Sequence, residues 1–203
     1  MENAKQRLKM LSLLFLLSLT GCAKYDSRSL PKMEGEEYTV DNIQVSKKIL
    51  TEHEVREIFG RDSSTEFNKK GIQPVILNIK NKTDKKYIFK SDDIDLKMKN
   101  PDAVAKMLHK KTSLRVVGWS ILGLFVWPCF IGAAIDGVSS KNYNKDLDKD
   151  MATKALYPHE IIKIRPNEKI SKIIFVAKDN FVSKLNLRLV ESLNKSQQVK
   201  FII

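Results

Sequence analysis

Histidine and cysteine are scarce in this chain, which has three and two of them among 203 residues. The histidines are isolated from one another and from the cysteines, so the usual zinc-binding spacings are absent. The sequence also lacks a phosphate-binding loop, a dinucleotide fingerprint and a serine-hydrolase motif. We therefore expect no enzyme activity, no catalytic residues, no metal and no cofactor.

Acidic residues are outnumbered, with 24 Asp and Glu against 36 Lys and Arg, and the formal net charge is +12. A basic chain invites a nucleic-acid interpretation. However, the lysines are scattered, and aromatic residues, at 8% of the chain, are not interleaved with them as a base-stacking surface requires. We expect no nucleic acid among the partners.

The N-terminus predicts export. A basic head with Lys5, Arg7 and Lys9 precedes an apolar run that ends in small residues. The residues Leu19-Thr20-Gly21-Cys22 resemble the lipobox of bacterial lipoproteins, which is cut before a cysteine that carries lipid on its sulfur. The resemblance implies a signal peptide over residues 1–21 and lipidation of Cys22.

Lipidation of Cys22 has two consequences. Two or three acyl chains hold a protein stably at a membrane, whereas one chain does so only marginally. Cys129 is then left without a partner, so no internal disulfide forms and the fold depends on its core. In lipoproteins an aspartate after the cysteine tends to retain the protein at the inner membrane. Ala23 therefore favours the periplasmic leaflet of the outer membrane in a cell with two membranes.

Polar residues with Pro31 and Gly35 follow the cysteine and predict a flexible tether over residues 22–37. The remaining residues, 38–203, suit one domain.

Alternation of apolar and polar residues predicts about seven or eight strands. Before the middle of the chain we expect one bulged strand over 38–50, a hairpin of 75–79 with 87–90, and a third strand over 94–98. After the middle we expect four strands, in residues 159–166, 169–178, 184–192 and 197–203.

Three segments predict helices instead. Residues 51–60 contain a capping box, with Thr51 followed by Glu54. Residues 101–111 begin with a proline after Asn100, and residues 139–156 are polar with helical character. Too few helices alternate with strands for a parallel sheet. We therefore expect a mainly β fold, an antiparallel β-sandwich interrupted by a helical, hydrophobic insert over residues 101–156.

This layout resembles uncharacterised bacterial lipoproteins with an immunoglobulin-like β-sandwich. The resemblance rests on the lipobox, on residues 73–83 with the sequence QPVILNIKNKT, and on the run from Ile164-Arg165-Pro166 to Phe175-Val176. These are turn and core residues, so the resemblance implies a fold but no catalytic activity or ligand. Asn167 stands where glycine is usual and can also adopt a left-handed turn.

The insert contains an apolar stretch, residues 114–135, that is long enough to span a bilayer. Its Leu, Ile, Val and Phe residues favour insertion by roughly 3 to 7 kcal/mol before Gly, Ser and Pro subtract from this. We expect a membrane or partner contact through its large apolar side chains: Trp119, Leu122, Leu124, Phe125, Trp127, Phe130 and Ile131.

A single crossing by this stretch is disfavoured. It would put the two groups of strands on opposite sides of the membrane, and the basic residues before the stretch oppose that orientation. Pro128 divides the stretch into two short arms. A helical hairpin that enters one leaflet or lies against a partner fits better, while burial in the protein's own core and a true span remain alternatives.

These features predict a non-enzymatic, lipid-anchored envelope protein with a structural or partner-binding role. Its expected partners are the bilayer and an envelope protein. The alternative is an exported enzyme or ligand-binding lipoprotein whose pocket lies between the sandwich and the insert.

Overall fold

The computed structural model describes residues 25–32, 37–110, 128–180, 184–194 and 196–203, with the backbone alone for 128–137. The chain divides into two compact units. The β unit comprises Ser27–Leu108 and Asp148–Ile203, and the helical unit comprises Met1–Asp26 and His109–Leu147.

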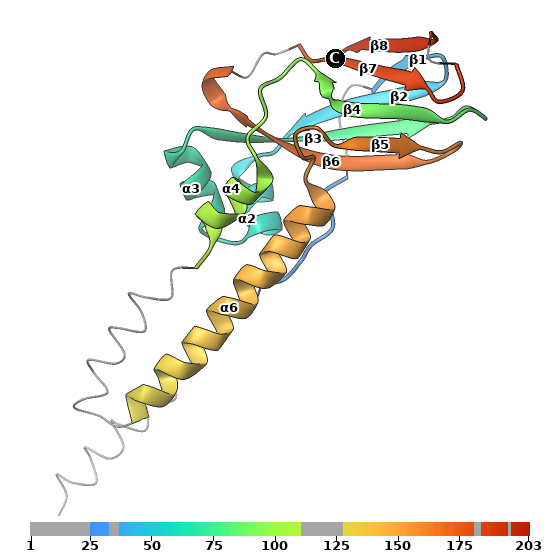
Figure 1. Cartoon of the computed structure of the whole chain (residues 1–203). Helices are drawn as coiled ribbons and strands as arrows, with labels where there is room; N and C mark the ends of the chain where they lie inside the picture. Colours follow the sequence, from blue (N-terminus) through green and yellow to red (C-terminus); the bar gives the residue numbers. More distant parts are fainter. Residues whose placement is uncertain (1–24, 33–36, 111–127, 181–183, 195) are drawn as a thin grey trace, which may run out of the picture. The chain divides into compact units, whose positions relative to one another are not determined.

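The described part of the β unit contains two four-stranded antiparallel sheets (Figure 1). Sheet A has the order β1-β2-β3-β6, formed by Glu37–Val40, Ile43–Ile49, Ile72–Asn81 and Lys169–Ala177. Sheet B has the order β5-β4-β7-β8, formed by Ile161–Ile164, Tyr87–Ile94, Asn186–Glu191 and Gln198–Ile202. Strands from before and after the insert pair within both sheets, so the fold is mainly β and sandwich-like.

The predicted single strand over 38–50 is wrong, because β1 and β2 form a hairpin there. Asp41 and Asn42 join them, with φ angles of 50° and 61°. Two central residues with positive φ are typical of the tight turns whose twist matches paired strands, and Asp and Asn tolerate this conformation.

The predicted hairpin of 75–79 with 87–90 is also wrong. These residues belong to β3 and β4, which lie in different sheets. Asn81 fixes the connection, since its side-chain nitrogen donates to the carbonyls of Lys85 and Arg165 at 2.7 and 2.9 Å. The third strand expected over 94–98 is absent as well: β4 continues to Ile94, and Met98 forms only an isolated bridge with Val176.

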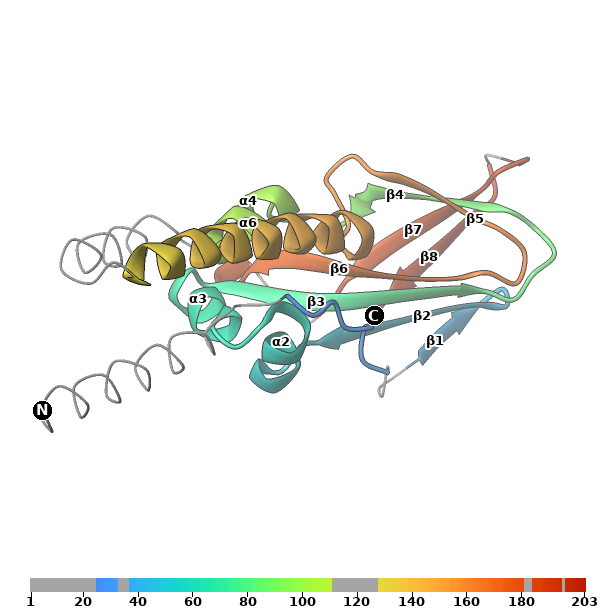
Figure 2. The same ribbon diagram turned by 90° about the horizontal axis from the view of Figure 1, so that it is seen from below.

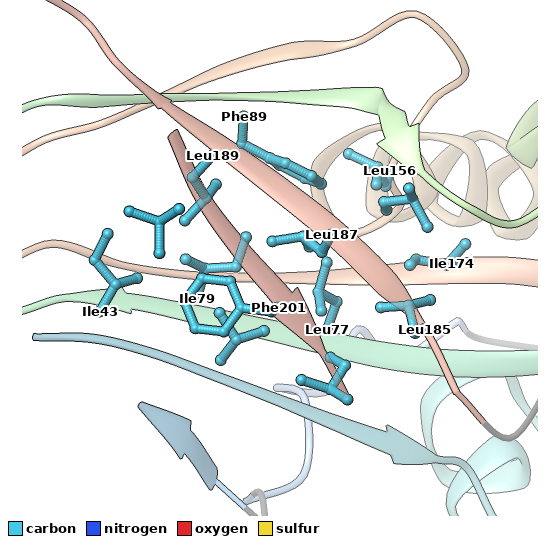
Figure 3. Close-up of a cluster of buried hydrophobic side chains, with 14 of the residues drawn as sticks. Ile43, Leu77, Ile79, Phe89, Leu156, Ile174, Leu185, Leu187, Leu189 and Phe201 are labelled. Atoms are coloured by element: carbon cyan, nitrogen blue, oxygen red, sulfur yellow. The ribbon is translucent and has the colours of Figure 1, made fainter. Parts of the chain in front are cut away.

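The two sheets share one apolar core (Figure 3). Sheet A contributes residues such as Ile43, Leu77 and Ile79, and sheet B contributes Phe89 and Leu189, all with 2% exposure or less. The period-2 alternation of the strands places these residues on the inner faces.

Short helices cover the outer face of sheet A. α2, Glu52–Phe59, has the predicted capping box between Thr51 and Glu54. α3, Ser63–Lys69, was not predicted, because it carries a single large apolar residue, Phe67, and shows no helical period. The rings of Phe59, Phe67 and Phe175 lie 5.5 to 5.8 Å apart and join α2, α3 and β6. Aromatic pairs at these distances add to the stabilisation from burial.

Two further helices flank the undescribed part of the insert. α4, Pro101–Leu108, begins as predicted after Asn100, whose side-chain oxygen accepts from the backbone nitrogen of Asp102 at 2.8 Å. The Asp102 carboxylate also accepts from the Tyr157 hydroxyl at 2.9 Å. Burial, together with this bond, raises the pKa of Tyr157 to about 12.

α6, Pro128–Lys154, is longer than the helix expected over 139–156 and begins within the apolar stretch. Its 27 residues correspond to about 40 Å of helix. At its end Lys172 donates to the carbonyls of Thr153 and Ala155, both at 3.2 Å, which satisfies acceptors that a helix terminus leaves free. No helix in the described part of the chain is long and apolar enough to cross a membrane.

Candidate functional site

Most of the predicted contact residues lie outside the described residues: Cys22, Trp119, Leu122, Leu124, Phe125 and Trp127. Phe130 and Ile131 lie in the first turn of α6, where only the backbone is described. The candidate site therefore consists of described residues next to these segments. They lie after Cys22, before the apolar stretch and after the apolar stretch.

Four residues of the helical unit join these three places, and we call them the clasp: Tyr25, Lys110, Tyr143 and Asn144. The rings of Tyr25 and Tyr143 meet edge to face, with centroids 5.3 Å apart and an interplanar angle of 88°. The Lys110 ammonium lies 5.3 Å from the centroid of the Tyr143 ring, a cation–π contact.

Asn144 completes the clasp, because its side-chain amide forms hydrogen bonds with both the N–H and the carbonyl of Lys110. Its side-chain oxygen accepts from the Lys110 backbone nitrogen at 2.8 Å, and its side-chain nitrogen donates to the Lys110 carbonyl at 3.3 Å. The chain is thus held against α6 just after α4 ends. This is the point from which it continues toward residue 114.

The helical period of α6 sets the geometry of the clasp. Ser140, Tyr143 and Leu147 are buried at spacings of three and four residues, which place them on one face of the helix. Asn144 lies beside that face and is half-buried. Of the two clasp residues on α6, Tyr143 therefore lies on the buried stripe and Asn144 lies at its edge.

Chain length limits how far the neighbouring segments extend from the clasp. Cys22 precedes Tyr25 by three residues, which span at most about 11 Å. Leu114 follows Lys110 by four residues, which span at most about 14 Å. Tyr25 and Lys110 are thus the described residues nearest in sequence to Cys22 and to the start of the apolar stretch.

The residues after Tyr25 make a second set of contacts, within the β unit. Ser27 donates to the Asp150 carboxylate at 2.5 Å, and Lys154 lies 2.7 Å from the same carboxylate. Lys154 also donates to the Arg28 carbonyl, and Arg28 forms an ion pair with Glu57 at 3.7 Å. Part of the segment interpreted as a tether therefore has defined contacts with α6 and α2.

We call residues 27–32 the strap. Both views show it on the side of sheet A that faces away from the core (Figure 2). The neighbouring side chains of Ser46 and Asn78, in register on β2 and β3, are 6% exposed on that outer face. The strap and the helices together cover a surface that a four-stranded sheet would otherwise leave open.

Replacing Asn144 with alanine is expected to free the backbone of Lys110. Two hydrogen bonds at roughly 0.5 to 1.5 kcal/mol each are lost, so local opening becomes easier. Hydrogen exchange at the Lys110 amide should accelerate by about tenfold, corresponding to roughly 1.4 kcal/mol. Asn142→Ala, two positions away and exposed, is the matched control and should leave this rate unchanged. Equal rates in the two variants would contradict the role given to Asn144.

Replacing Asp150 with alanine is expected to loosen the strap. The change leaves the largely buried Lys154 ammonium without its carboxylate, and the free energy of unfolding should fall by about 1 to 3 kcal/mol. Denaturant unfolding measures this loss, and proteolysis within residues 27–32 should become faster. Asp179→Ala, at an exposed aspartate, is the control. If both variants have the same free energy of unfolding and the same rate of proteolysis, the strap contacts do not stabilise the protein.

The described residues contain no group of His, Cys, Asp or Glu side chains that could hold a metal ion. His159 and Asp92 form an exposed pair at 2.9 Å, and this hydrogen bond lowers the pKa of Asp92. The two side chains are 85% and 55% exposed, so water screens their interaction.

Comparison with known proteins gives no further guide to function. No protein-family model matches the chain, and neither curated proteins nor solved structures give a significant match.

Proposed function

We propose that this protein is a lipid-anchored lipoprotein of a bacterial cell envelope, attached through Cys22, with a second membrane contact through residues 114–135. Its role is structural or partner-binding, without catalysis. In a cell with two membranes, Ala23 favours the periplasmic leaflet of the outer membrane.

The clasp is the observation that carries this proposal. It ties together the residues that follow Cys22, the residues that precede the apolar stretch, and the helix that leaves it. Cys22 is three residues from Tyr25 and Leu114 is four residues from Lys110, so a lipid on the cysteine and the apolar stretch can reach the same membrane surface.

We further propose that the two sheets form an immunoglobulin-like sandwich. In the constant type of that fold, strands A, B, E and D form one sheet, and C, F and G form the other. The observed orders β2-β3-β6 and β4-β7-β8 match A-B-E and C-F-G. β5 departs from the constant type by pairing with β4, at the position where variable-type domains add a strand next to C.

Metabolic labelling with a fatty-acid analogue tests the anchor. The wild-type protein should incorporate the label, and Cys22→Ser should not, because the serine hydroxyl does not replace the thiol in lipoprotein acylation. Cys129→Ser is the matched control and should be labelled like the wild type. Equal labelling of all three proteins would contradict the proposal.

A further inference from the structure

The exposed side of α6 carries a short stripe directly after the apolar stretch. Val138, Lys141 and Lys145 follow one another at spacings of three and four residues, which place them on one face of the helix. All three are exposed, Val138 at 62%, and they lie opposite the buried stripe that contains Tyr143 and Leu147. Between Val138 and Lys145 this face therefore changes from apolar to basic, and the exposed Asp148 and Lys149 follow on it.

We propose that this stripe binds anionic phospholipid headgroups. This proposal rests on the second membrane contact proposed above and names the class of lipid that it takes. An anionic bilayer fits the stripe better than an acidic protein does, because the stripe is continuous with the apolar stretch through α6.

The helical rise sets the depth of these lysines. At 1.5 Å per residue, Lys141 lies about 9 Å beyond Ile135 along α6, and Lys145 about 15 Å beyond it. The headgroup region on each side of a bilayer is about 5 to 8 Å thick. With the apolar end of α6 in the leaflet, the long side chain of Lys141 reaches the headgroups directly, and a tilted helix brings Lys145 there too.

The charge balance of the helical unit supports the same partner. Between His109 and Leu147 the sequence has five basic residues and two aspartates, a net charge of +3. A surface of this sign attracts an anionic leaflet.

Vesicle binding tests the proposal with the mature Cys22→Ser chain, which lacks the lipid that would otherwise hold it irreversibly. Vesicles of pure phosphatidylcholine are compared with vesicles containing phosphatidylglycerol. We expect tighter binding to the second kind. Lys141→Gln with Lys145→Gln should reduce that binding by roughly 25-fold, about fivefold per lysine, and leave binding to phosphatidylcholine unchanged.

The matched control is Lys163→Gln with Lys200→Gln, two exposed lysines of sheet B. This pair should keep the binding of the parent chain. Equal affinity for both kinds of vesicle, or an equal loss in both double variants, would overturn the anionic-lipid inference alone. Absence of binding to either vesicle would also overturn the second membrane contact.

Discussion

Loss of both membrane contacts is expected to release the protein into the soluble fraction, whereas loss of either one leaves it bound. Cys22→Ser removes the lipid. Lysine at positions 122, 124 and 125 (Leu122→Lys, Leu124→Lys and Phe125→Lys) removes the apolar contact. Each lysine costs about 2.5 to 3.5 kcal/mol of insertion, so the three exceed the roughly 3 to 7 kcal/mol that the apolar stretch supplies.

The measurement is fractionation of cell envelopes without detergent. Residues 1–21 are replaced by an ordinary cleavable export signal in the proteins that lack Cys22, so that no uncleaved leader acts as an anchor. The combined variant should remain folded and soluble. If the three lysines instead unfold the protein, the stretch belongs to its own core. If Cys22→Ser alone is fully soluble, the second contact does not exist.

Leu189→Ala is expected to lower the free energy of unfolding by about 2 to 5 kcal/mol. Leu189 is 0% exposed in the core between the sheets, and truncation there loses burial and leaves a cavity. A domain of this size has a total stability of about 5 to 15 kcal/mol, so the loss is a large share.

Leu193→Ala is the matched control, because Leu193 follows the same strand but is 94% exposed. Its effect should stay within about 0.5 kcal/mol. Denaturant unfolding of both variants measures the difference. Similar stabilities would mean that the two sheets do not share the core described above.

Local patterns in the sequence predicted local structure well. The capping box at Thr51 and Glu54 located α2, and alternating residues located the four strands after the insert. Asp41 and Asn42 are residue types that tolerate positive φ in a turn, but the imperfect alternation of apolar residues around them suggested one bulged strand. α3 had no periodic pattern to indicate it.

Such local patterns could not predict contacts between residues that are far apart in the sequence. Whether β3 and β4 pair or separate into two sheets depends on which strands arrive later in the chain, here β6 and β7. The clasp and the strap were missed for the same reason. Tyr25 and Asn144 are ordinary residues in a polar setting, and only the fold brings them to Tyr143 and Lys110.

Thiol accessibility tests most directly whether the protein meets one membrane surface without crossing it. Single changes Lys111→Cys and Lys141→Cys, made in a Cys129→Ser background, place reporters before and after the apolar stretch. Both cysteines should react with a membrane-impermeant thiol reagent once the outer membrane is permeabilised. Protection of the cysteine at position 141 alone, until the inner membrane is also broken, would show a span and contradict this account.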